Sequence, residues 1–101
     1  LRLDQNIELI KGDIVETIPE YVRKNPSFKI SLLHIDVDLF EPTGAALETF
    51  FDHVVQGGII ILDDYGAFAG ATKAIDNFFG ERPERIQRLD YTTSISFVEK
   101  L

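Results

Sequence analysis

The chain has 101 residues, 45% hydrophobic and 27% charged, a balance typical of one small globular domain rather than a disordered or fibrous protein. Ten Lys and Arg against seventeen Asp and Glu give a net charge of −7, which disfavours nucleic acid or an anionic membrane as a partner. Cysteine is absent, which excludes disulfides and thiolate sites, and no apolar run approaches the about 18–20 residues of a membrane span. Without a signal peptide the chain is expected to be cytoplasmic, and its start at Leu1 rather than Met suggests a trimmed or partial chain.

The first third of the chain predicts a strand, a turn and a helix. Residues 7–10 are a short apolar-rich run that ends in a Lys-Gly-Asp turn signal. Over residues 14–24 apolar side chains recur at spacings of three and four, which predicts an amphipathic helix that ends at Asn25-Pro26. Pro19 lies inside this run and leaves the first turn of the helix less certain than the rest.

The middle of the chain predicts a strand, a helix and another strand. Residues 29–36 are almost continuously apolar, as in a strand that is buried on both faces. A second helix is expected over residues 43–55, with the glycines of residues 56–58 in the role of its C-terminal cap. Residues 58–62 form the next buried strand, which ends abruptly at two aspartates.

The last third predicts a helix over residues 70–79 and a hairpin with strands at 86–89 and 94–98 around a turn at 90–93. The alternation of strands and helices predicts a three-layer, Rossmann-like α/β fold. Its sheet would be mostly parallel, with helices on both faces and a C-terminal antiparallel hairpin whose last strand lies at an edge. Because the sheet is small for such a fold, we interpret residues 1–101 as a single partial domain.

Acidic residues follow three of the predicted strands. They are Asp13, then Asp36 and Asp38, then Asp63 and Asp64. Ligands of open α/β sheets bind beyond the carboxyl ends of the strands, where neighbouring strands lie about 4.8 Å apart. Carboxylates from two such ends would repel one another unless a cation or a proton lies between them.

Oxygen ligands without cysteine favour a hard ion, Mg²⁺ first, with Mn²⁺ or Ca²⁺ as alternatives. Asp36 and Asp38 are two residues apart and would share one side of an extended chain. The alternative is that these acids are solvated loop residues or helix N-caps, and for Asp13 the two interpretations are balanced.

Other polar and aromatic residues carry weaker signals. His34 lies within a predicted buried strand and is expected to be a hydrogen-bonded core histidine, and His53 suits the end of a helix. Tyr65 and Phe68 could flank a substrate, but packing is the favoured explanation. No glycine-rich phosphate loop, serine nucleophile elbow or HExxH motif is present in the sequence.

Residues 32–79, LLHIDVDLFEPTGAALETFFDHVVQGGIIILDDYGAFAGATKAIDNFF, resemble the macrocin O-methyltransferase family. These are S-adenosylmethionine-dependent sugar O-methyltransferases of antibiotic biosynthesis and their relatives. The DxD strand, the GG pair, the DDYGAF-x-G segment and the following AIDNFF helix carry the similarity. LIKGDIVETIP upstream and RLDYTTSISFVEK at the end are similar to the family as well.

The resemblance implies a role for each acidic residue. Asp36, Asp63 and Asp64 match the family's ligands of a divalent metal, usually Mg²⁺, and Asp38 matches its proposed general base. The metal would bind two neighbouring hydroxyls of a sugar or polyol acceptor, and Asp38 would take the proton of the attacking one. Asp13 resembles an acidic position near the adenine of the cofactor, and we assign Asp13 and Asp36 to the cofactor side of the site.

Two features of the family precede Leu1 and are missing here: the glycine-rich turn after its first strand, and the acidic ribose ligand after its second. The chain therefore looks like the C-terminal half of a class I methyltransferase, without the N-terminal cofactor-binding strands. Its open sheet edge would need cover, either from the rest of a larger enzyme or from a second copy in a homo-oligomer.

Two other functions compete with this one. A strand followed by DxD also resembles haloacid-dehalogenase phosphatases, in which Asp36 would be the nucleophile and Asp38 the acid and base. That family needs a lysine, and none lies between Asp36 and Asp63. The third interpretation is a catalytically inactive fragment or an assembly module.

Overall fold

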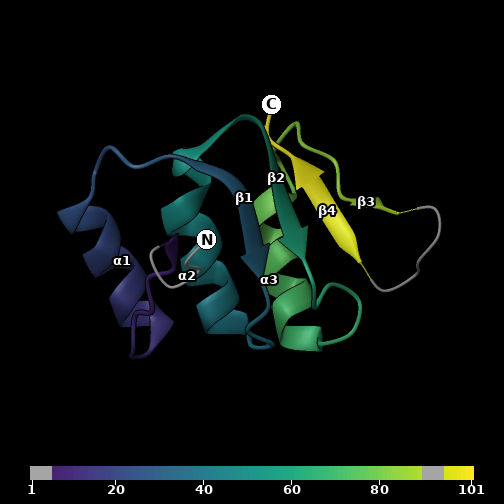
Figure 1. Ribbon diagram of the computed structural model, residues 1–101. Coiled ribbons are helices and arrows are strands. Elements are labelled where there is room, and N and C mark those ends of the chain that lie inside the picture. Colours follow the sequence, from purple (N-terminus) through teal and green to yellow (C-terminus); the bar gives the residue numbers. More distant parts are fainter. Residues whose placement is uncertain (1–5, 90–94) are drawn as a thin grey trace.

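A computed structural model describes residues 6–89 and 95–101, which form a mixed α/β fold of four strands and three α-helices (Figure 1). In chain order the elements are α1 (Ile14–Lys24), β1 (Ile30–Ile35), α2 (Phe40–Phe50), the 3-10 helix η2 (Phe51–His53), β2 (Val54–Leu62), α3 (Ala69–Phe79), β3 (Gln87–Arg88) and β4 (Ser96–Glu99). The α/β class expected from the sequence is confirmed. The predicted hairpin turn at 90–93 and Ser94 lie outside the described residues.

The order of strands in the sheet is β1-β2-β4-β3. β1 runs parallel to β2, whereas β4 is antiparallel to both β2 and β3. The prediction that the last strand lies at an edge is therefore wrong, since β4 is internal and the two-residue strand β3 is at the edge. This placement fits the side chains, because Ser96 and Val98 of β4 are completely buried while both residues of β3 are exposed.

The three helices lie side by side, and all of them contribute to one core on one face of the sheet (Figure 1). The core lies between this helical layer and the buried strand residues Ile35, Ile60, Leu62 and Val98. Within the described residues, helices therefore cover one face and not two as expected. The connections through α2 and α3 run in the same direction across the sheet, from β1 to β2 and from β2 to the edge strand β3, and right-handed crossovers then place both helices on the same side.

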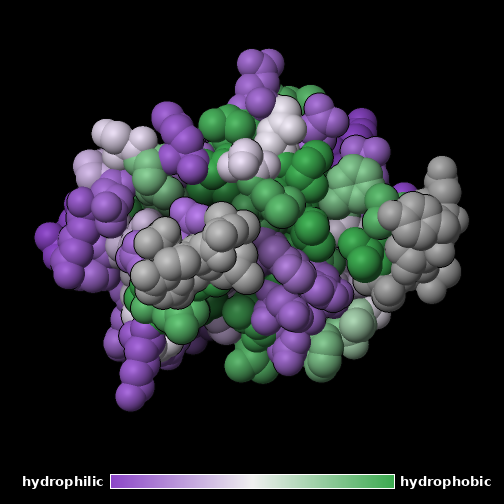
Figure 2. Space-filling model, in the orientation of Figure 1, coloured by the Kyte–Doolittle hydropathy of each residue, from purple (hydrophilic) through white to green (hydrophobic). Residues whose placement is uncertain are grey.

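The opposite face of the sheet is open in the part of the chain that the structure describes. Leu32 is 60% exposed there, and Ile59, Ile61 and Phe97 are half-buried. Figure 2 shows hydrophobic surface over the middle of the molecule, where Figure 1 places β2 and β4. The prediction that residues 29–36 are buried on both faces is corrected accordingly.

Leu47 of α2 illustrates how much the core depends on single side chains, because none of its surface is exposed. We expect Leu47→Ala to lower the free energy of unfolding of the intact protein by about 2–5 kcal/mol, from lost burial and the cavity left behind. Urea denaturation measures this, with exposed Glu48→Ala of the same helix as a control that stays within about 0.5 kcal/mol. A Leu47→Ala midpoint equal to that of the control would contradict this description of the core.

α1 has the predicted bounds, Ile14–Lys24. Asp13 is its N-cap, with a carboxylate oxygen that accepts a hydrogen bond from the Val15 N–H at 3.0 Å. Asn25 ends the helix, where its N–H donates to the carbonyl groups of Tyr21 and Val22. Pro19 lies inside the helix without ending it.

The predicted strand at residues 7–10 does not form. Ile7, Leu9 and Ile10 are 60%, 91% and 50% exposed, and no strand of the described sheet pairs with them. A β-strand is stable only when a neighbour completes its hydrogen bonds, so the local pattern is not sufficient.

α2 begins at Phe40 and ends at Phe50, earlier than the predicted 43–55, and β2 already begins at Val54. Gly57 and Gly58 therefore lie within β2 and are not a helix cap. They occupy a bulge, since the pairing with β1 steps from Ile30–Val54 to Leu32–Ile59. Gly57 has φ +83°, and a Cβ on Gly58 would lie 3.2 Å from the Ser31 carbonyl oxygen, so both positions favour glycine.

Over residues 6–89 and 95–101, every helix is too short or too polar to cross a lipid bilayer.

Candidate active site

The candidate site lies at the carboxyl ends of β1 and β2. Ile35 and Leu62 are the last paired residues of these parallel strands, and Asp36 and Asp63 follow them directly. The Asp63 N–H donates to the Ile35 carbonyl at 3.1 Å, which extends the ladder by one hydrogen bond. The sheet therefore brings the two acidic segments to the same edge, as the strand order required.

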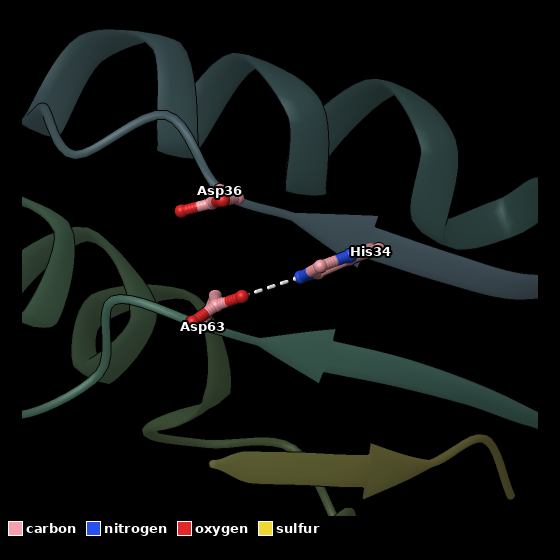
Figure 3. A group of neighbouring side chains, drawn as sticks. All are labelled: His34, Asp36 and Asp63. Atoms are coloured by element: carbon pink, nitrogen blue, oxygen red, sulfur yellow. Dashed lines mark hydrogen bonds and ion pairs between the residues drawn. The ribbon is translucent and has the colours of Figure 1, made fainter. Parts of the chain in front are cut away.

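The acidic side chains form two overlapping groups that share Asp36. Donor atoms of His34, Asp36 and Asp63 lie within 4.8 Å of one another, and so do those of Asp36, Asp38 and Asp64 (the first group is drawn in Figure 3). His34 lies on β1 and Asp36 directly follows that strand. Asp63, which directly follows β2, lies opposite them. Each group offers donors that suit a divalent cation.

Asp38 reaches its group by an unusual backbone conformation. The strand has already ended at Ile35, so the same-side argument for Asp36 and Asp38 does not apply. Instead Asp38 has φ +63°, and its N–H donates to the Asp64 carboxylate at 2.8 Å. This left-handed conformation is more accessible to Asp and Asn than to most residues. Asp64 itself is only 4% exposed. Its carboxylate accepts the hydrogen bond that holds the Asp38 segment in place.

Two carboxyl groups of the site have raised pKa values. Desolvation is the first cause that raises the pKa of Asp36 above its ordinary 3.8, and the charges of Asp63 and Asp64 add to it. The pKa of Asp38 is also raised, first by a side-chain hydrogen bond with Asp64 and then by desolvation. Both shifts make these carboxylates better proton acceptors than isolated ones.

The raised pKa values determine the direction in which the free energy of unfolding changes with pH. Because the folded state holds these protons more tightly than the unfolded state, the free energy of unfolding falls as pH rises above about 3.8 through the raised pKa values. In EDTA at neutral pH we expect Asp36→Asn to raise the Tm by about 1–3 °C, and this gain should vanish below about pH 3.8. Thermal melts against pH measure it, with the exposed Asp52→Asn, which lies before β2, as a control. An equal gain in Tm at both pH values would contradict the explanation from the raised pKa of Asp36.

Asp13 lies in neither acidic group. Its carboxylate caps α1 as described above, which is the structural alternative that the sequence had left open. The assignment of Asp13 to the cofactor side stays a prediction.

His34 is a residue that the sequence interpretation missed. It was expected in the core, yet its side chain is 50% exposed and its Nε2 lies 2.7 Å from Asp63 Oδ2 (Figure 3). The error follows from treating β1 as buried on both faces. His53 packs elsewhere, stacked on Phe28 with its Nδ1 3.1 Å from the Phe28 carbonyl oxygen.

The four aspartates line an open cavity with Gly66, Ala67, Phe68 and Arg88. Phe68 is 47% exposed and forms part of its wall, whereas Tyr65 packs against the core and donates its hydroxyl to Asp76 at 2.7 Å. The structure thus separates the two aromatic residues that the sequence had treated alike. Arg88 of β3 adds a positive charge to the cavity, in which the other charged residues are acidic. Nothing in the sequence indicated that Arg88 lies at the site.

Comparison with known proteins gives consistent results. The family model described as macrocin O-methyltransferase (TylF) matches residues 2–96. The chain is 30% identical over 78 residues to 8-demethyl-8-(2,3-dimethoxy-alpha-L-rhamnosyl)-tetracenomycin-C 4'-O-methyltransferase of Streptomyces olivaceus. It is 29% identical over 76 residues to demethyldecarbamoylnovobiocin O-methyltransferase of Streptomyces niveus. These matches cover 77% and 75% of this chain and 28% of each relative, so the chain spans less than a third of their length.

Solved structures resemble the fold over nearly the whole chain. Apo CalS11, a TDP-rhamnose 3'-O-methyltransferase in calicheamicin biosynthesis, has a TM-score of 0.81 and 30% identity, over 90% of this chain and 40% of that one. The O-methyltransferase NovP has a TM-score of 0.83 over 97% of this chain and 39% of that one; at 23% identity it supports the fold alone. Because the family match extends from residue 2 to residue 96, the chain belongs to the macrocin O-methyltransferase (TylF) family.

Proposed function

We propose that the intact protein is a metal-dependent, S-adenosylmethionine-dependent O-methyltransferase that methylates a hydroxyl of a sugar or polyol. The observation that carries the proposal is the convergence of Asp36, Asp38, Asp63 and Asp64 on one cavity at the ends of two neighbouring strands. Family membership and the activities of the named relatives supply the reaction class. Residues 1–101 would be one part of a single methyltransferase domain.

The metal ligands in this proposal are Asp36, Asp63 and Asp64. Their donor chemistry fits the proposal, because Asp36 lies within 4.8 Å of Asp63 in one group and of Asp64 in the other, and carboxylate oxygens suit a hard ion such as Mg²⁺. A divalent cation here would supply electrostatic stabilisation of an acceptor oxygen as its negative charge develops.

Asp38 is the proposed general base. Its carboxylate lies in the same group as Asp36 and Asp64, and its raised pKa strengthens it as a proton acceptor. The hydrogen bond from its N–H to the buried Asp64 fixes the backbone that carries it. Asp38 would accept the proton of an acceptor hydroxyl bound in the cavity, and the hydroxyl oxygen would take the methyl group of the cofactor.

The methyl donor in this proposal is S-adenosylmethionine, as the family implies, with Asp13 and Asp36 on its side of the site. The acceptor is a small molecule with neighbouring hydroxyls, which a cation held by the acidic residues would bind. The proposal places the enzyme in the cytoplasm and involves no nucleic acid or membrane, and assembly into a homo-oligomer is one way to cover the open face of the sheet.

The experiment is a methyl-transfer assay of the intact protein with radiolabelled S-adenosylmethionine and a panel of nucleotide-linked sugars. The proposal expects product with at least one acceptor that carries vicinal hydroxyls, and loss of product when EDTA removes the metal. Turnover that EDTA leaves unchanged would remove the metal from the mechanism. Absence of product across the panel, together with absence of cofactor binding, would favour an inactive or assembly role.

A further inference from the structure

His34 and Asp63 contact each other although both are partly in water. His34 Nε2 lies 2.7 Å from Asp63 Oδ2, and the side chains are 50% and 39% exposed (Figure 3). Exposed pairs of this kind usually contribute little to stability, because water competes for both partners. A short contact at this place is therefore more informative about the site than about folding.

The sheet fixes the relative positions of the two residues. His34 is paired with Ile61 across the β1–β2 ladder, and Asp63 lies two residues beyond Ile61 on the same side of the chain. The Asp63 N–H also donates to the Ile35 carbonyl at 3.1 Å, which holds its backbone against β1. Both side chains therefore start from a rigid backbone, and a single hydrogen bond is enough to choose the rotamer of the Asp63 carboxylate.

We propose that His34 is a positioning residue for Asp63: its Nε2–H donates to Oδ2 and fixes the orientation of the carboxylate that would hold the cation. The inference rests on the metal centre proposed above. It requires that the proton is on Nε2 of His34. Hard cations prefer oxygen over imidazole nitrogen, so His34 supports a ligand and does not replace one.

A matched pair of substitutions tests this role in the intact protein. His34→Gln keeps an N–H donor at a comparable reach, whereas His34→Leu removes the donor and keeps a side chain of similar length. We expect His34→Leu to raise the Kd for Mg²⁺ by about tenfold or more, the usual effect of removing a group that supports a ligand. His34→Gln should stay within about threefold of the unsubstituted protein. Isothermal calorimetry with Mg²⁺ alone measures both, and because the side chain is half exposed, the Tm of each variant should change little.

The other outcomes are equally decisive. An unchanged Kd in His34→Leu, while Asp63→Asn loses binding, would overturn the inference and leave the metal centre intact. Equal losses in His34→Leu and His34→Gln would overturn it in favour of direct ligation by the imidazole. A directly bound histidine nitrogen in the electron spin echo modulation of the Mn²⁺-loaded protein would do the same. If the unsubstituted protein binds no Mg²⁺, the proposed metal centre fails and the inference fails with it.

Discussion

Asp38→Asn should lower kcat for methyl transfer by about 10²- to 10⁴-fold, the usual range for loss of a positioned general base. The amide cannot accept the proton of the acceptor hydroxyl. Asparagine also adopts a left-handed backbone readily, so the φ of +63° at this position should be preserved. The main-chain hydrogen bond from residue 38 to Asp64 does not depend on its side chain, and the amide of asparagine can donate to Asp64 where the protonated carboxyl would. The change therefore isolates the chemistry of the carboxylate from its structural surroundings.

The measurement is a single-turnover assay with saturating cofactor and acceptor, supported by the Kd of each. Binding of S-adenosylmethionine should be unchanged, and Asp52→Asn, an exposed acid of η2 that precedes β2, is the matched control for loss of one negative charge. If Asp38→Asn keeps more than about a tenth of the rate, the role of general base belongs to another residue.

Asp36→Asn should remove measurable Mg²⁺ binding from the intact protein. Asp36 is the one residue common to both acidic groups, so its loss affects every arrangement of ligands that the described residues offer. The effect should be at least as large as the about 10–100-fold loss caused by residues that only support a ligand. Asp63→Asn should behave similarly if Asp63 is a ligand, and both variants should lose methyl transfer.

Calorimetry with Mg²⁺ measures this directly, again with Asp52→Asn as the control. Heats that are the same for Asp36→Asn and the unsubstituted protein would remove the metal assignment. The Tm of the same variant without metal, which is expected to be higher than that of the unsubstituted protein, distinguishes loss of binding from unfolding.

The sequence predicted the elements that local signals determine. α1 was expected over about residues 14–24 with an uncertain first turn, and it spans Ile14–Lys24, because Asp13 caps its start and Asn25-Pro26 follows its end. The acidic edge followed from one general property of parallel strands, which is that their carboxyl ends meet. That property, together with the correct order of the two strands, was enough to predict that Asp36 and Asp63 lie beside each other.

The remaining features depend on neighbours that a local pattern does not show. Residues 7–10 have the composition of a strand, yet no described strand pairs with them. Gly57 and Gly58 were expected to cap a helix, but they lie within β2, where Gly57 has φ +83° and a Cβ on Gly58 would lie 2.9 Å from the Val55 carbonyl oxygen. His34 was misplaced because burial of β1 was assumed on both sides. The structure exposes Leu32 and His34, whereas the sequence has leucine at both 32 and 33 and gives no signal of which side is open.

Asp63 attaches to β1 twice, through its main-chain N–H to Ile35 and through its carboxylate to His34. The hydrogen bond that ends the β1–β2 ladder and the group of His34, Asp36 and Asp63 therefore form and separate together. Fraying of the strand ends would separate the donor atoms, and a ligand held between them would in turn slow fraying. Hydrogen exchange at the Asp63 amide should consequently slow when a ligand occupies the site. A main-chain proton would then report binding by the side chains.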